Sequence, residues 1–245
     1  MNHVPETAVQ YQAVMNALSE KTGDRMSPDC PSRAEVRTQI LWFALNYVAN
    51  EGRAGSHCDG GGTFAAGKGC WRTAYRGLVP GDLVLIRFGH NDASIRLPEI
   101  DRKRGHPEFV DVGFKERLRL YVSQSLEKGA LPILVTPAAR NAPWQDGVLG
   151  HAHKGFPGSV AEVAAGIEVP LLDLHKRSME FLTAQGQEQV HWRYFVNLEP
   201  GEWGKYPEGL KDNTHFHNNG AVEVAKLGPE GLVDIAYALG RGSVR

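Results

Sequence analysis

The pattern of hydrophobic and polar positions changes near residue 79. Beyond it, short runs of consecutive apolar residues alternate with longer segments in which apolar residues recur every three or four positions. Consecutive apolar residues are typical of strands buried on both faces, whereas the second spacing is typical of helices. Because the two kinds of segment alternate, this part of the chain predicts parallel strands joined by helices, in a layered α/β fold.

Three strands and four helices are predicted in this region. The strands cover residues 83–88, 131–136 and 169–174, and the helices cover residues 109–128, 159–167, 176–184 and 221–239. Ser159 is placed to cap its helix, since Glu162 follows three residues later. Gly228 and Pro229 predict an interruption of the last helix. Residues 199–210, which are rich in Gly and Pro, predict a loop.

The first 78 residues do not follow this pattern. Residues 10–18 look helical where a strand would be expected to open such a sheet, and residues 52–77 are rich in glycine without clear periodicity. The chain has 245 residues, of which 42% are hydrophobic. This is long enough for one large α/β domain and too short for two comfortable ones. We therefore expect a single domain over residues 1–245, atypical in its first 78 residues.

The charge of the chain narrows the class of partner. Its formal net charge is −1, and its pI is near 6.8. Nucleic acid and acidic membrane surfaces are bound well only by a basic surface, so neither is predicted as a partner. We expect a small or neutral molecule instead, and the sequence makes no prediction of oligomeric state.

The sequence as written predicts a cytoplasmic protein. No apolar stretch approaches the length that spans a bilayer, and residues 1–21 lack the basic start and apolar core of a signal peptide. The three cysteines, Cys30, Cys58 and Cys70, are odd in number and spaced unlike a zinc motif. Neither a disulfide framework nor a structural metal site is therefore predicted.

The candidate chemistry begins with Asp212 and His215, which precede an apolar run predicted to start the last helix. A neutral imidazole acts as a base near pH 7 when its tautomer and direction are fixed. A nearby carboxylate does both by accepting the other ring proton. Because Asp and His three residues apart are also common in solvated loops, the spacing gains weight only from the other motifs.

Asn91 follows the strand predicted at residues 83–88, in the sequence Gly-His-Asn-Asp at residues 89–92. An amide at the C-terminal edge of a parallel sheet can donate hydrogen bonds to a developing oxyanion. The alternative is an asparagine that caps the next turn. An acyl-transfer enzyme needs a nucleophile, a base, an acid that orients the base and oxyanion donors, and Asn91, Asp212 and His215 supply three of these parts.

Several ordered segments resemble the SGNH (GDSL-type) hydrolases, and within them are most similar to bacterial rhamnogalacturonan acetylesterases. They are residues 81–92 with Gly-His-Asn-Asp, residues 135–137, residues 200–202 with 206–209, and residues 212–216 with Asp-Asn-Thr-His-Phe. The match runs from about residue 79 to about residue 227. In this family Asn91 would match the oxyanion asparagine, His215 the base, and Asp212 its orienting acid.

The resemblance implies a fold and an activity. The fold would be a three-layer α/β/α sandwich around a doubly wound, flavodoxin-like parallel sheet, with the first strand altered or missing. The activity would be removal of acetyl groups from a pectic polysaccharide by a Ser-His-Asp mechanism, without a metal or other cofactor. The expected partner is therefore an acetylated carbohydrate substrate.

The N-terminal part departs from the family. Family members begin with an apolar strand that ends in Gly-Asp-Ser, whose serine is the nucleophile, but the nearest match, residues 23–27, reads Gly-Asp-Arg-Met-Ser. Arg25 stands in the place of the serine, and Ser27 lies two residues later. The family's second segment, of the type Asn-x-Ala-x-x-Gly-Arg-Ser, is echoed at residues 47–54, where Gly52 is a candidate backbone donor to the oxyanion.

Three hypotheses account for this departure. Ser27 could act as the nucleophile from a shifted turn. The chain could be a natural variant that lost its nucleophile and retains binding. Alternatively, residues from about 25 to about 76 could reflect a shifted reading frame, since all three cysteines and a glycine cluster fall there. An altered N-terminus could also hide a secretion signal, in which case the protein would be secreted or periplasmic.

A metal-dependent hydrolase is one rival interpretation. His151 and His153 form one pair of alternate histidines, and His215 and His217 form another, which could present both imidazoles of each pair on one side of an extended segment. The alternative is that these histidines lie in polar loops and bind no metal.

A protein that binds carbohydrate without turnover is the other rival. Four aromatic residues in the predicted loops could stack on sugar rings: Trp144, Trp192, Trp203 and Tyr206. A position in the hydrophobic core is the alternative, above all for Trp192. Trp144 and Tyr206 are the candidate substrate-binding residues.

Overall fold

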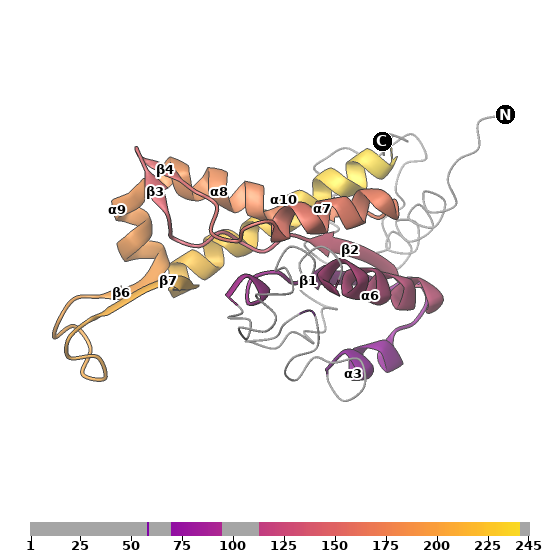
Figure 1. Ribbon diagram of the computed structural model, residues 1–245, viewed down its shortest axis with the longest axis horizontal. Coiled ribbons are helices and arrows are strands. Elements are labelled where there is room, and N and C mark those ends of the chain that lie inside the picture. Colours follow the sequence, from indigo (N-terminus) through magenta and orange to yellow (C-terminus); the bar gives the residue numbers. More distant parts are fainter. Residues whose placement is uncertain (1–57, 59–69, 95–112, 241–245) are drawn as a thin grey trace, which may run out of the picture.

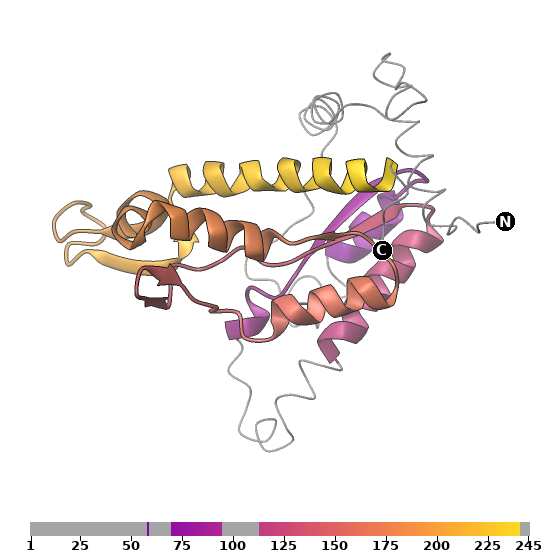
Figure 2. The same ribbon diagram turned by 90° about the horizontal axis from the view of Figure 1, so that it is seen from above.

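In the computed structural model of the protein, the described residues are residue 58, residues 70–94 and residues 113–240. A parallel three-stranded sheet lies at the centre, in the order β1 (Leu83–Arg87), β2 (Leu131–Val135) and β5 (Leu171–Leu172). Helices α6 (Lys115–Glu127) and α7 (Phe156–Gly166) lie on one side of it, and α10 (Asn218–Gly240) lies on the other (Figures 1 and 2). The predicted α/β class, the parallel sheet and the helices on both faces are confirmed.

Strand β2 forms the middle of this sheet and is buried along its whole length. Its side chains alternate between two hydrophobic clusters, because successive residues of a strand point to opposite faces. Leu134 packs with α6 and α7, whereas Ile133 and Val135 pack with Val224 of α10. The prediction of a strand buried on both faces is confirmed here.

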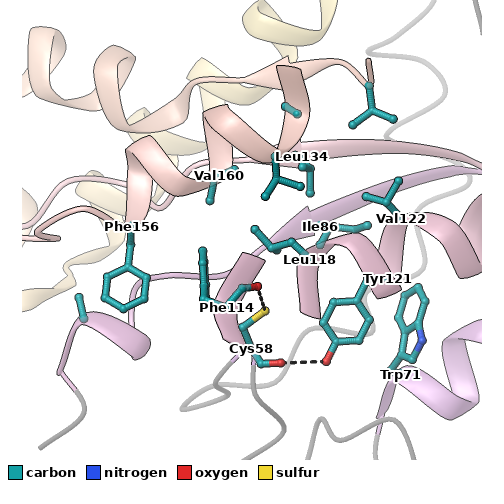
Figure 3. Packing of buried hydrophobic residues seen from close by; sticks show 14 residues of the cluster. Cys58, Trp71, Ile86, Phe114, Leu118, Tyr121, Val122, Leu134, Phe156 and Val160 are labelled. Carbon is teal, nitrogen blue, oxygen red and sulfur yellow. Dashed lines mark hydrogen bonds between the residues drawn. The ribbon is translucent and has the colours of Figure 1, made fainter. Parts of the chain in front are cut away.

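The cluster beneath α6 and α7 is aromatic (Figure 3). The rings of Phe114 and Phe156 meet edge to face with centroids 4.9 Å apart, and Tyr121 stacks on Phe88 with centroids 5.4 Å apart. Cys58 is fully buried in the same cluster, and its thiol donates to the Phe114 carbonyl at 3.8 Å. The Cys58 carbonyl accepts a 3.2 Å hydrogen bond from the Tyr121 hydroxyl. Residue 58 is thereby fixed to α6.

Strand β1 differs from its prediction on one face. Ile86 is buried, but Leu85 is 54% exposed, and Arg87 is also exposed. Among the described residues β1 pairs with β2 alone, in register from Leu83 opposite Leu131. It is therefore an edge strand in the described part of the chain, and the prediction that residues 83–88 are buried on both faces is wrong.

The starts of two helices also differ from the prediction. Helix α7 begins at Phe156 with Gly155 as its N-cap and a proline in its first turn, so Ser159 does not cap it. Helix α8 (Leu174–Gln185) begins two residues early because Asp173 caps it, accepting a 3.1 Å bond from the Lys176 N–H. Residues 109–112 of the first predicted helix lie outside the described residues.

Helix α10 continues through Pro229, so its predicted interruption is wrong. Proline removes one backbone hydrogen bond from a helix interior. The apolar face of α10 offsets this loss, because Val224 is buried in the cluster beneath it and Leu227, Leu232 and Ile235 pack against that cluster.

The remaining elements surround the sheet. They are α3 (Cys70–Gly77), η1 (Asp92–Ser94), the antiparallel pair β3 (Trp144–Gln145) and β4 (Val148–Leu149), α9 (Gln187–Gln189), the π-helical turn η3 (Val190–Tyr194), and the antiparallel pair β6 (Phe195–Leu198) and β7 (Leu210–Phe216). Helix α3 and strands β6 and β7 were not predicted. The helix predicted at residues 10–18 lies outside the described residues. No helix in the described ranges combines the length and the apolar character that crossing a membrane requires.

The start of α10 is packed against the backbone of Tyr194, directly before β6. The His217 N–H donates to the Tyr194 carbonyl at 2.9 Å. A Cβ atom on Gly220 would overlap that carbonyl oxygen and would lie 2.8 Å from its carbon and 2.9 Å from the Tyr194 Cα. The close approach of α10 to β6 therefore requires glycine at this position.

We expect Gly220→Ala to lower the free energy of unfolding by about 1–3 kcal/mol, because backbone atoms must move to admit the methyl group. Gly158→Ala is the matched control. Position 158 is also helical and a Cβ there meets nothing within 4 Å, so alanine should stabilise by about 0.5–1 kcal/mol. Urea unfolding followed by circular dichroism measures both. Equal effects of the two substitutions would contradict the tight approach at Gly220.

Candidate active site

Asp212 and His215 lie on β7 and contact each other directly. The Asp212 Oδ2 is 2.7 Å from the Nδ1 of His215. Its Oδ1 accepts the backbone N–H groups of Thr214 at 2.8 Å and of His215 at 2.9 Å. A carboxylate held this way accepts the Nδ1 proton of the ring and leaves Nε2 as the basic nitrogen. The predicted spacing therefore does bring the acid onto the imidazole.

The surroundings of the two groups differ. The side chain of His215 is 76% exposed, and that of Asp212 is 24% exposed. Partial burial acts to raise the pKa of the Asp212 carboxyl, but the hydrogen bonds from His215 and Thr214 outweigh it and hold that pKa below its ordinary value. Asp212 is therefore ionised at neutral pH, while His215 remains open to a reactant.

The pair was expected in a loop, but the structure places it on a strand. Strand β7 pairs with β6, and the pairing is irregular between Phe195 and Asn197. The Asn197 side chain accepts the Asp212 N–H at 2.9 Å and donates to the His191 carbonyl at 2.8 Å. A buried amide thus fixes the backbone of Asp212. The residues of β7 between Leu210 and Phe216 are polar, so its hydrophobic pattern is weak, which is why the sequence did not reveal it.

The segment after β2 joins the two predicted motifs. The Asn141 N–H donates to the Asn213 carbonyl at 2.9 Å, and the Asn141 amide donates to the Asn213 side-chain oxygen at 3.0 Å. The adjacent Arg140 donates to the carbonyl of His90 at 2.7 Å. Sequence reasoning missed both residues, although their place at the C-terminal end of a buried strand is the signal that could have identified them.

Asn91 lies half-buried in the loop that follows β1. This loop is closed by Asp92, whose Oδ2 accepts the Gly89 N–H at 3.0 Å and whose Oδ1 accepts the Cys58 N–H at 2.8 Å. Gly89 has φ +106, and a Cβ on it would lie 3.3 Å from Phe156 and Pro137. A larger residue is therefore disfavoured by the backbone conformation and would also press on these two side chains.

The loop of Asn91 lies within electrostatic range of His215. The pKa of His90 is lowered to about 4, chiefly by burial and in addition by the charges of Arg140, Arg87 and His215. The structure thus brings the Gly-His-Asn-Asp loop and the Asp212–His215 pair to the same edge of the sheet.

The predicted nucleophile and the second oxyanion donor, Ser27 and Gly52, lie outside the described residues. The hydroxyls of Ser125 and Ser178 donate to helix carbonyls, at 2.8 Å and 2.7 Å. No hydrogen bond joins His215 to a serine in the ranges that the structure describes. The candidate site therefore contains a base, an acid and an amide donor.

The two histidine pairs of the rival metal site make separate contacts. His151 contacts His175, His153 contacts His90, and His215 contacts Asp212. Within the described residues, no three His, Cys, Asp or Glu side chains are grouped as metal ligands.

The four aromatic residues proposed to stack on sugars differ in exposure. Trp144 is partly buried and donates its indole N–H to the Asn141 side chain at 2.8 Å. Trp203 is 52% exposed and meets Tyr206 edge to face, with centroids 5.5 Å apart. Trp192 is 44% exposed, so the expectation that it lies in the core is wrong.

A shallow cavity of about 370 Å³, wide open to solvent, lies beside Trp192 and is lined also by Gln187, Glu188 and His191. The His191 Nδ1 is 3.4 Å from the Asn141 amide nitrogen. Asn141 also contacts Asn213, which lies between Asp212 and His215 in the chain. The buried side chain of Asn141 therefore lies between this cavity and strand β7, which carries Asp212 and His215.

The chain is similar in sequence to known esterases. The chain is 32% identical over 220 residues to the rhamnogalacturonan acetylesterase RhgT of Bacillus subtilis (strain 168), across 89% of this chain and 90% of RhgT. It is 32% identical over 162 residues to the probable rhamnogalacturonan acetylesterase YesY of the same strain, across 66% of this chain and 67% of YesY.

The fold has a solved counterpart. The crystal structure of the protein YxiM from Bacillus subtilis matches with a TM-score of 0.59 and 21% identity, over 85% of this chain and 51% of that chain. YxiM, an uncharacterized esterase, is 26% identical over 156 residues, which are 63% of this chain and 35% of YxiM. No protein-family model matches the chain. From the extent of the match to RhgT, the chain belongs to the rhamnogalacturonan acetylesterases, a family of SGNH-type hydrolases.

Proposed function

We propose that the protein is an esterase that removes acetyl groups from rhamnogalacturonan, a pectic polysaccharide, by a Ser-His-Asp mechanism. The observation that carries this proposal is the 2.7 Å contact between the Asp212 carboxylate and the Nδ1 of an otherwise exposed His215. The names of RhgT and YesY support the substrate class. We further propose that residues 1–245 act as one domain of this type.

In this mechanism His215 moves the protons. Its Nε2 takes the proton of the serine hydroxyl as the serine oxygen attacks the acetyl carbonyl carbon. The same nitrogen then gives the proton to the sugar oxygen as the ester bond breaks, leaving an acetyl-enzyme. Water attacks this intermediate by the same route and releases acetate. Asp212 stabilises the imidazolium that forms in each step.

Asn91 is proposed to stabilise the negative oxygen of the tetrahedral intermediate. Its amide can donate at the edge of the sheet where His215 also lies, and the loop of Asn91 is rigid because Gly89 and Asp92 close it. Gly52 would supply a second donor from its backbone N–H. Fixed donors stabilise charge better than water does, since they need no reorganisation during the reaction.

Sugar contacts are proposed on the aromatic surface next to this site. Trp203 and Tyr206 lie on the loop between β6 and β7, the hairpin that projects at the left of Figure 1, and Trp192 borders the cavity beside η3. Exposed rings of this kind offer apolar faces to the apolar faces of pyranose rings. Trp144 is proposed to act indirectly, because its indole N–H already supports Asn141.

A second candidate function is binding of acetylated pectic fragments without turnover. The exposure of Trp192 and Trp203 favours it as much as it favours the esterase, since stacking on sugars does not require a nucleophile. The two functions differ in whether a serine reacts.

We expect His215→Ala to lower kcat for p-nitrophenyl acetate by about 10⁴-fold or more, because the serine then lacks its base. The fold should persist, since this side chain is exposed. The matched control is His217→Ala, which removes another exposed imidazole two residues away and should leave kcat unchanged. Equal activity of His215→Ala and the parent protein would refute the assigned base.

We expect Ser27 to react with a covalent serine-directed inhibitor, because a nucleophile activated by His215 attacks such reagents. Mass mapping of the labelled protein locates the modified residue, and Ser27→Ala should abolish both label and esterase activity. Ser32→Ala serves as the control within the same segment. A label on another serine would transfer the nucleophile role to that residue. Binding of acetylated pectin fragments without a label would select the non-catalytic function.

We expect Trp203→Ala to raise KM for acetylated rhamnogalacturonan by about tenfold, which corresponds to ~1.4 kcal/mol of lost contact. The KM for p-nitrophenyl acetate should not change, because so small a substrate does not extend beyond the reacting group. Trp203→Phe keeps an aromatic face and should restore most of the affinity. An equal rise in KM for both substrates would show that Trp203 supports the fold rather than the sugar.

A further inference from the structure

Four histidines meet at the C-terminal edge of the parallel sheet, and the proposed mechanism uses none of them. The His153 Nε2 lies 3.0 Å from the His90 Nδ1, and the His151 Nδ1 lies 3.1 Å from the His175 Nε2. The rings of His153 and His175 meet edge to face, with centroids 5.3 Å apart. The four rings link the loop after β1, the segment before α7, and the start of α8.

Each pair of facing nitrogens shares one proton, and the neighbouring groups decide which ring holds it. The His175 Nδ1 is 3.2 Å from the Pro137 carbonyl, which accepts only. Neutral His175 therefore carries its proton on Nδ1 and accepts at Nε2. His151 must then donate from its own Nδ1.

The same reasoning applies to His90 and His153. A backbone hydrogen bond to Ala138 raises the pKa of His90, which identifies the partner as the Ala138 carbonyl. With its Nδ1 facing His153, His90 donates from Nε2 and accepts at Nδ1. His153 therefore donates its Nε2–H to His90. The remaining nitrogen of His153, its Nδ1, is fully buried and has no hydrogen-bond partner among the residues that the structure describes.

The environment keeps both rings neutral. The pKa of His153 is lowered to about 3, chiefly by burial and in addition by interactions with His90, Arg140 and His175. The pKa of His90 is lowered to about 4 by burial, with Arg140, Arg87 and His215 as the charged neighbours. A proton added to either ring would bring two N–H groups into opposition and break the contact.

We propose that His153 is a positioning residue that holds Asn91 in place through His90. This inference rests on the oxyanion role proposed above for Asn91. His90 is the residue directly before Asn91, and the structure fixes it at three points: its carbonyl by Arg140, its Nε2 by Ala138, and its Nδ1 by His153. Of the three contacts, the one from His153 comes from the segment that leads into α7.

A buried imidazole that leaves one nitrogen unpartnered is unfavourable by itself, because a leucine or phenylalanine would bury no polar atom. Among the residues that the structure describes, the hydrogen bond that the His153 ring makes is the one to His90. The hydrogen bond that His153 donates to the loop of Asn91 therefore explains why a histidine occupies this fully buried position.

Two amide substitutions separate this role from simple filling of space. The side-chain nitrogen of glutamine reaches about as far as the histidine Nε2, so His153→Gln can still donate to His90. The nitrogen of asparagine reaches only about as far as Nδ1, so His153→Asn cannot. We expect His153→Asn to lower kcat for p-nitrophenyl acetate by about 10–100-fold with little change in KM, since small misplacement of a transition-state donor affects turnover. His153→Gln should retain kcat within about threefold.

The outcomes are distinct from those of the proposed function. If His215→Ala is inactive while His153→Asn and His153→Gln both retain kcat, the esterase stands and the positioning role is wrong. If both amide variants lose activity equally, His153 fills space and the role is again wrong.

Should the parent protein hydrolyse no ester, nitrogen-15 NMR of the histidine rings still tests the contact. His90 should show a single tautomer, protonated at Nε2, in the parent and in His153→Gln, and a mixture in His153→Asn. A tautomeric mixture at His90 in the parent protein would overturn the inference.

Discussion

The geometry of the site depends on the hydrogen bonds that Arg140 and Asn141 make directly after β2. Arg140 holds the carbonyl of His90, and Asn141 holds both the backbone and the side chain of Asn213. Two motifs more than 100 residues apart in the chain are thus fixed by neighbouring residues. Asn141 is 3% exposed, so these contacts satisfy the polar atoms of a buried amide.

This arrangement is held in place by the strand that precedes it, which is buried along its whole length. All five residues of β2 are buried, and side chains from α6, α7 and α10 pack on its two faces. Residues at the C-terminal ends of parallel strands emerge at one edge, where ligands of open α/β sheets bind. The hydrophobic core and the candidate chemistry are therefore coupled through one short segment, residues 136–141.

The sequence predicted this framework where local pattern and tertiary structure agree. Strand β2 and the Asp212–His215 pair could be predicted from a few neighbouring residues. A run of apolar residues indicates burial on both faces, and an acid three residues before a histidine indicates their contact. The exposure of Leu85 depends on which strands flank β1, and the passage of α10 through Pro229 depends on the packing of its apolar face. The roles of Arg140 and Asn141 depend on contacts with His90 and Asn213, which no window of the sequence contains.

The buried histidines bear on the base as well as on the loop of Asn91. In the proposed mechanism His215 becomes positively charged in each proton transfer, and the electrostatic effect of His215 on His90 shows that the two rings interact. That interaction is reciprocal, so a proton on His90 would oppose the formation of the imidazolium at His215. Burial of His90 and His153 prevents this at neutral pH by lowering the pKa of each ring to about 4 and about 3. The neutral rings of His90 and His153 avoid repulsion of the imidazolium at His215, and the Asp212 carboxylate attracts it. Both effects therefore stabilise the imidazolium that forms during the reaction.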